Sequence, residues 1–164
     1  MEIYSFVLGA QVKYCKLNVK HPFLEGTYMN LAIFNRSLKQ FGESLMMWKR
    51  LEQLQKFLYG DDNYMLLYTL KNIGTCYLGI GQSDTARKYF LDCISLIQNA
   101  KSDTVKEDLI VKDKEEIAQL NQNIYLTYVS DRKYIEAIES SEKAIEIIAE
   151  IYGSRSKRLS SKLY

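Results

Sequence analysis

Three asparagines recur at matching positions along the chain, and their side chains could bind a peptide backbone. Asn30, Asn72 and Asn123 are separated by 42 and then by 51 residues. An asparagine amide offers both a donor and an acceptor, which complement the N–H and C=O groups of an extended peptide. A row of such amides would hold a peptide segment without reacting with it. The alternative is that each asparagine caps a helix or bonds to its own backbone.

The residues around these asparagines indicate what kind of ligand would fit. Tyr68, Lys71 and Thr75 are spaced so that they share one face of a helix. This mixture suggests a ligand with apolar side chains and an acidic group near Lys71, although a solvated lysine is an equally simple reading. The candidate binding residues are Asn30, Ile33, Tyr68, Lys71, Asn72, Thr75, Gln122 and Asn123.

Residue types that would support catalysis or metal binding are sparse. His21 is the only histidine, and the three cysteines (Cys15, Cys76 and Cys93) lack the spacing of a metal site. The glycines of Gly79–Gly81 do not form a dinucleotide-binding fingerprint, since no strand precedes them and the third glycine is missing. We therefore expect no catalytic residue, no metal and no cofactor, and a protein that is not an enzyme.

The asparagines belong to a longer internal repeat. Residues 28–51 align with 70–93 at an offset of 42, and a third copy spans 120–147 at a further offset of 51. Apolar residues recur at helical spacing on both sides of a short break in each copy, which predicts a pair of antiparallel helices. Small side chains are expected where the helices cross, because bulky ones would push the helix axes apart. These crossing positions are Ala32/Ser44/Leu51, Gly74/Ala86/Cys93 and Tyr125/Ala137/Ala144.

The break between the two helices is most evident at Gly81, which can take the left-handed conformation that ends a helix. Lys39 and Arg132 replace this glycine in the other two copies. The nine added residues of the third copy fall in a charged segment without glycine or proline, so we expect an extended first helix there.

The composition and length of the chain predict a single all-α domain that contains these repeats. The 164 residues are 47% hydrophobic and 26% charged with a net charge of +2, and only one is proline. No apolar run reaches the roughly 18 residues of a membrane span, and the N-terminus does not read as a signal peptide. The repeats divide the chain into 1–20 (the second helix of a preceding repeat), 21–60, 61–100, 101–152 and 153–164 (the start of a further repeat).

These copies resemble the tetratricopeptide repeat, through the small-residue positions given above. The 42-residue period and linkers such as "KHPFLEGTYMNLA" are similar to those of the kinesin light chain type. The resemblance implies a right-handed helical-repeat solenoid whose first helices line a concave groove. It also implies that the recurring asparagine position holds peptide in that groove, which assigns this role to Asn30, Asn72 and Asn123.

The expected function is therefore a scaffold or adaptor that binds a peptide or partner protein in the concave groove. The three cysteines are an odd number without metal-type pairing, which fits a reducing compartment, so we expect a cytoplasmic protein. The resemblance implies a cytoskeletal, motor-cargo or ciliary assembly. Further repeats or subunits would cover the two ends. A peptide-sensing module that controls an effector domain outside this chain is the alternative. The basic run Arg155–Lys162 lacks the aromatic context of nucleic-acid modules, so no nucleic-acid partner is expected, and no membrane.

Overall fold

The described part of the chain is entirely helical. The structure, a computed structural model, describes residues 6, 9, 21–61, 63–99 and 107–160. Within these ranges there are six long helices and no strand. The expected all-α class is therefore confirmed. The prediction for residues 1–20 falls outside the described residues, apart from Phe6 and Gly9.

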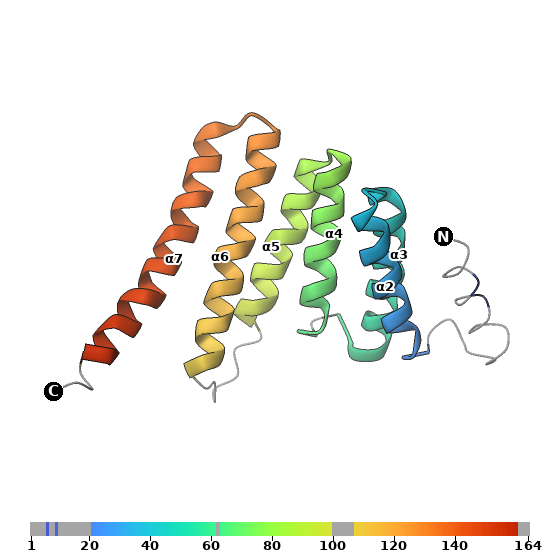
Figure 1. Cartoon of the computed structure of the whole chain (residues 1–164), viewed down its shortest axis with the longest axis horizontal. Helices are drawn as coiled ribbons and strands as arrows, with labels where there is room; N and C mark the ends of the chain where they lie inside the picture. The colour runs from blue at the N-terminus through green and yellow to red at the C-terminus, as the bar shows by residue number, and fades with distance from the viewer. Residues whose placement is uncertain (1–5, 7–8, 10–20, 62, 100–106, 161–164) are drawn as a thin grey trace. The chain divides into compact units, whose positions relative to one another are not determined.

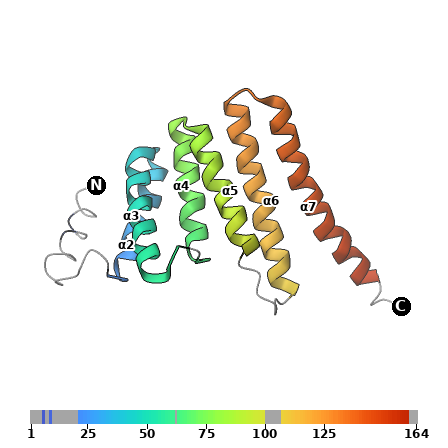
Figure 2. The same cartoon turned by 180° about the vertical axis from the view of Figure 1, so that it is seen from behind.

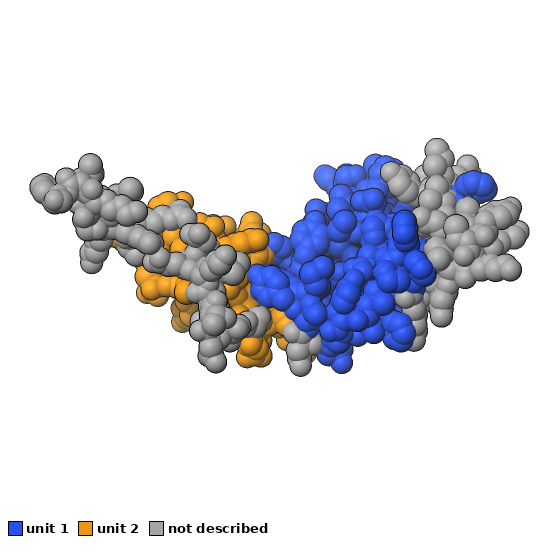
Figure 3. Space-filling model, turned by 90° about the horizontal axis from the view of Figure 1, so that it is seen from below, with its two compact units in different colours: residues 1–82 blue, residues 83–164 orange. Residues whose placement is uncertain are grey.

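The helices form two compact units, residues 1–82 and 83–164, which are coloured separately in Figure 3. In each unit, helices that follow one another in sequence pack together and run in opposite directions (Figures 1 and 2). Unit 1 holds α2 (Leu24–Ser37), α3 (Phe41–Tyr59) and α4 (Leu66–Ile80). Unit 2 holds α5 (Ser83–Asn99), α6 (Glu107–Ser130) and α7 (Tyr134–Ser160).

The small residues of the first copy lie where α2 and α3 cross. Ala32 and Ser44 are completely buried, and the Ser44 hydroxyl donates a 2.7 Å hydrogen bond to the carbonyl oxygen of Ala32. A bond from one helix to the backbone of the other requires close helix axes. Trp48 is also completely buried in this unit, and a side chain of that size contributes about 1.5–3 kcal/mol on burial.

The turn between the two helices of each copy has the same hydrogen-bond pattern in all three. At the end of α2, Lys39 N–H donates to Arg36 C=O (2.9 Å) and Gln40 N–H to Asn35 C=O (2.9 Å). Gly81–Gln82 and Arg132–Lys133 repeat this pattern after α4 and α6. It is the Schellman ending, which needs one residue in the left-handed conformation. Gly81 provides it at φ 87°, and Lys39 and Arg132 adopt φ 59°.

The starts of α2 and α4 are also equivalent. The His21 imidazole accepts a 3.2 Å hydrogen bond from the Phe23 N–H, and the Asn63 amide oxygen accepts a 2.8 Å bond from the Met65 N–H. Each bond satisfies a backbone donor that has no partner within the helix. His21 therefore acts in starting a helix, as its place beside Pro22 suggests.

Helix lengths differ more than the turns do. α6 has 24 residues, whereas α2 has 14 and α4 has 15. The part of the added segment at 100–106 lies outside the described residues. Residues 153–160, which the sequence assigns to the start of a further repeat, instead continue α7 through Gly153 to Ser160.

Candidate functional site

One face of α4 gathers three of the predicted binding residues. Tyr68, Lys71 and Thr75 lie along a single stripe, and Tyr68 is 46% exposed while the other two are half-buried. The Tyr68 ring packs edge-on against Trp48 of α3, with ring centroids 5.7 Å apart. The Thr75 hydroxyl donates to the Lys71 carbonyl (3.0 Å), which leaves its oxygen able to accept another bond. This stripe offers an aromatic ring, a cation and a hydroxyl to a ligand.

Asn72 lies beside this stripe but is only 4% exposed. Its Nδ2 donates to the Tyr68 carbonyl (2.7 Å), and its Oδ1 accepts a 2.6 Å bond from Nη1 of Arg36 on α2. Both ends of the amide are thus engaged, and Asn72 holds a guanidinium group next to the α4 stripe. The sequence reasoning missed Arg36, because the matching positions in the other copies are Leu78 and Val129 and give no recurring signal.

The remaining predicted residues lie on two other first helices. Asn30 is exposed and Ile33 is half-buried on α2 of unit 1. Gln122 is exposed and Asn123 is half-buried on α6 of unit 2. The hydrogen bond between Arg36 and Asn72 connects α2 to α4, the two helices of unit 1 that carry predicted binding residues.

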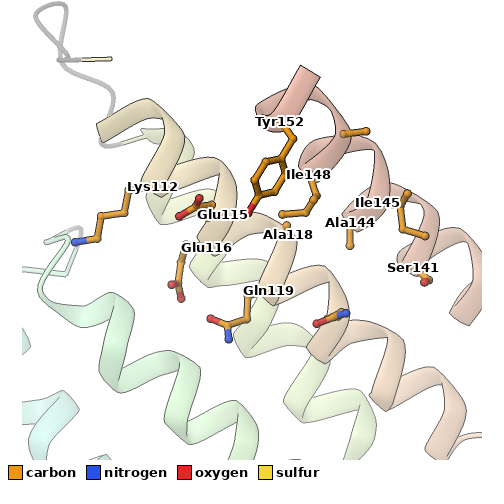
Figure 4. A pocket seen from close by; sticks show the side chains of 12 residues that line it. Lys112, Glu115, Glu116, Ala118, Gln119, Ser141, Ala144, Ile145, Ile148 and Tyr152 are labelled. Carbon is orange, nitrogen blue, oxygen red and sulfur yellow. The ribbon is translucent and has the colours of Figure 1, made fainter. Parts of the chain in front are cut away.

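Gln122 also lines a groove between α6 and α7. Figure 4 shows this groove from close by. The groove has a volume of about 820 Å³. Its α7 wall is largely apolar and its α6 wall is largely polar. The lining residues are Lys112, Glu115, Glu116, Ala118, Gln119 and Gln122 of α6, and Ser141, Ala144, Ile145, Ile148, Ala149 and Tyr152 of α7.

A charged cluster joins α5 to the end of α6. Arg87 donates to Asp84 (2.7 Å), Asp131 (2.6 Å) and Thr127 (3.1 Å), and its guanidinium lies 3.9 Å from the centre of the Tyr128 ring. Burial would raise the pKa of Asp131, but hydrogen bonds from Ser83 and Arg87 outweigh it and hold that pKa below its usual value. With so many internal partners, the Arg87 cluster has a structural role.

The described residues contain little that would support chemistry. Among them, no group of three or more histidine, cysteine or acidic side chains is arranged to hold a metal ion. Cys76 is buried, and burial raises the pKa of its thiol even though the Ser44 contact and the Arg36 charge oppose that rise. A thiol with a raised pKa is a poor nucleophile. Within the same ranges, no helix combines the length and the apolar character that crossing a bilayer requires.

The fold has relatives among solved structures. BtubC (BKLC) from P. vanneervenii superposes with a TM-score of 0.74 at 16% identity, over 93% of this chain and 56% of that one. Two structures of a kinesin light chain-like protein with nearly identical TPR-like repeats from Podosopora anserina give TM-scores of 0.70 and 0.67, at 16% and 17% identity. Each covers 91% of this chain and 65% of the other. The chain therefore spans less than two thirds of the length of these proteins.

Sequence comparison agrees with the fold. No curated protein sequence matches the chain significantly. Residues 23–99, which contain α2 to α5, match the family model of the tetratricopeptide repeat. Tandem repeats of this kind generally serve as binding surfaces for other proteins rather than as catalysts. Residues 23–99 thus match the tetratricopeptide repeat family, and the chain has the fold of kinesin light chain-like repeat proteins over more than nine tenths of its length.

Proposed function

We propose that this chain is a non-catalytic interaction scaffold that binds a peptide segment of a partner protein, with the main contacts on the face that α2 and α4 present in unit 1. The observation that carries the proposal is the α4 stripe of Tyr68, Lys71 and Thr75, with Arg36 held beside it by Asn72. Two cations next to an exposed aromatic ring suit a peptide with an acidic side chain and apolar neighbours.

The asparagine row belongs to the same proposal. Asn30 in unit 1 and Asn123 in unit 2 would each bond to peptide backbone, with Ile33 beside the former on α2 and Gln122 beside the latter on α6. Asn72 would act chiefly by orienting Arg36, because both ends of its amide are already bonded. The likeness to kinesin light chain-like proteins supports a cytoplasmic setting in a cytoskeletal, motor-cargo or ciliary assembly.

The test is to select ligands for the intact chain from a random peptide display library, and then to measure affinities by isothermal titration calorimetry. Selected peptides should be enriched in Asp or Glu next to apolar residues. Lys71→Glu should weaken binding at least tenfold, since it puts a like charge against the acidic ligand. Asn72→Ala should also weaken binding, because Arg36 then loses the acceptor that positions it.

Lys88→Glu is the matched control, because Lys88 is an exposed lysine on α5, outside the candidate stripe. It should change the affinity less than twofold. Selected peptides without acidic residues, or equal effects of Lys71→Glu and Lys88→Glu, would refute the assignment of this face.

A further inference from the structure

The groove between α6 and α7 exposes apolar side chains on one wall only. Ile145, Ile148 and Tyr152 of α7 are 64%, 36% and 58% exposed. In Figure 4 the Tyr152 ring and Ile148 extend from α7 toward the side of the groove formed by α6. These three residues occupy one stripe, since they are three and four positions apart on the helix. The α7 wall is therefore an apolar strip that runs along the groove.

The opposite wall is polar and acidic. Glu115, Glu116 and Gln119 of α6 line it, with Lys112 as the single cation among the lining residues. The nearby Lys114 is paired with Glu150 of α7 at 2.6 Å. A ligand that fills the groove must be apolar toward α7 and is favoured if it carries positive charge toward α6.

The earlier repeats show what covers the corresponding strip. Ile148 aligns with Gln55 of α3 and with Ile97 of α5, at the offsets of the internal repeat. Gln55 is 6% exposed and Ile97 is completely buried, and these two helices pack against α4 and α6, respectively. In each unit, then, the helix that follows covers this position, whereas at α7 the same position is open.

Unit 1 also shows how the covering helix sits. The Thr69 hydroxyl of α4 donates to Oε1 of Gln55 at 2.7 Å, and Tyr68 of α4 packs on Trp48. Trp48 aligns with Ser141, which lines the open groove. The groove on α7 therefore lies at the position where a further helix would pack, and two of the residues that line it are equivalent to residues of α3 that contact α4.

We propose that the α6–α7 groove binds a basic amphipathic helix of a partner protein, which lies on α7 as α4 lies on α3. Apolar residues of that helix contact Ile145, Ile148 and Tyr152, and its Lys or Arg residues face Glu115 and Glu116. This site is separate from the peptide-binding face of the proposed function, and its occupant is helical rather than extended.

The probe for the test is an 18-residue synthetic peptide, stapled to hold it helical and labelled with fluorescein. It has leucines at i, i+4, i+7 and i+11 and lysines along their flanks. A second probe has glutamates in place of the lysines. Fluorescence anisotropy with the intact chain should show at least tenfold tighter binding of the basic probe.

Three variants locate the site. Ile148→Glu should weaken binding of the basic probe at least tenfold, and Ile148→Ala should weaken it by a smaller factor. Ile135→Glu is the matched control, because Ile135 is 73% exposed on the same helix but does not line the groove. It should change the affinity less than twofold. Lys71→Glu should leave probe binding unchanged, which separates this test from that of the proposed function.

Several results would overturn the proposal. Failure of the basic probe to bind, equal affinity for the two probes, or an equal loss in Ile148→Glu and Ile135→Glu would each do so. Sedimentation velocity tests whether a second copy of this chain, rather than a partner helix, occupies the groove. A concentration-dependent dimer that Ile148→Glu abolishes would show that a second copy of this chain fills the groove, and would also overturn the proposal.

Discussion

Lys39 and Arg132 hold a left-handed backbone, with φ 59°, at the position where Gly81 ends the helix of the middle copy. For a residue with a Cβ this conformation costs on the order of 1 kcal/mol or more, because Cβ crowds the neighbouring carbonyl. The surrounding Schellman hydrogen bonds are the same in all three copies and hold both residues in that conformation. Both side chains are exposed, so replacing them would not open a cavity.

Lys39→Gly should therefore raise the free energy of unfolding by up to about 1 kcal/mol. Relief of the left-handed strain favours the folded state, and the greater freedom of glycine in the unfolded chain offsets part of that gain. Urea denaturation followed by circular dichroism would measure the change. Lys39→Ala is the control, since it removes the same side chain but keeps the Cβ; equal stabilities of the two variants would show that strain is not the cause.

At the scale of the elements, Arg87 connects α5 to α6 through several side-chain bonds. The Arg87 guanidinium is mostly buried, with a side chain 13% exposed, and Asp131 is 24% exposed. Hydrogen bonds between charged groups are stronger than those between neutral groups, so this cluster contributes to the packing of the two helices. The lowered pKa of Asp131 makes this contribution depend on pH.

Arg87→Met should lower the free energy of unfolding by about 2 kcal/mol at neutral pH, the typical contribution of hydrogen bonds to charged groups. A carboxyl group whose folded pKa is lowered stabilises the fold above its unfolded pKa, which is about 3.9 for aspartate. The difference from wild type should therefore hold between pH 7 and about 5, and shrink as the pH falls below about 4. Thermal denaturation across this range would measure it.

Lys88→Met provides the comparison, because Lys88 follows Arg87 on α5 and is exposed. It should change stability by less than about 0.5 kcal/mol, as is usual for surface positions. A difference between wild type and Arg87→Met that grows at low pH would contradict the assigned direction of the Asp131 pKa.

At the scale of the whole molecule, the two compact units can be followed by different signals. Trp48 is the only tryptophan of the chain and lies in the core of unit 1, whereas circular dichroism reports on all helices. In helical-repeat proteins, stability is approximately a sum of local and nearest-neighbour contributions. A change in one unit should therefore affect the two signals unequally.

In urea, Arg87→Met in unit 2 should lower the midpoint seen by circular dichroism more than the midpoint seen by Trp48 fluorescence. Lys39→Gly in unit 1 is the reciprocal variant, and it should shift the fluorescence midpoint at least as much as the circular dichroism midpoint. Identical shifts of both signals in both variants would instead mean that the chain unfolds as one cooperative unit.

The features that repeat could be predicted from the sequence, because the same chemistry recurs at fixed offsets. The helix pairs and the left-handed conformation of Gly81 are of this kind. The hydrogen bond from Arg36 to Asn72 uses an arginine that occurs in one copy only, so comparison of the aligned repeats could not predict it. The repeat register assigns residues 153–160 to a further helix, yet α7 continues through Gly153, since one glycine costs a helix only about 1 kcal/mol.

The α6–α7 groove could not be predicted either, because it depends on two walls that are brought together in space. Gln122 is a candidate through its register with Lys71, and that register carries no information about its place in this groove. The apolar residues of α7 have the spacing of a core-facing stripe. Whether such a stripe is covered depends on what packs against it, which spacing alone does not encode.

Because identical turns fix one end of every helix pair, any change in repeat length is confined to the opposite, open end. Leu24, the first residue of α2, aligns with Ile117, so the part of α6 before Ile117 has no counterpart in α2. Lys112, Glu115 and Glu116 all come from that extra part. A repeat array can thus acquire a new recognition surface by growth at one helix end, and trimming α6 by whole turns would delete the acidic wall while sparing the crossings that hold the repeat together.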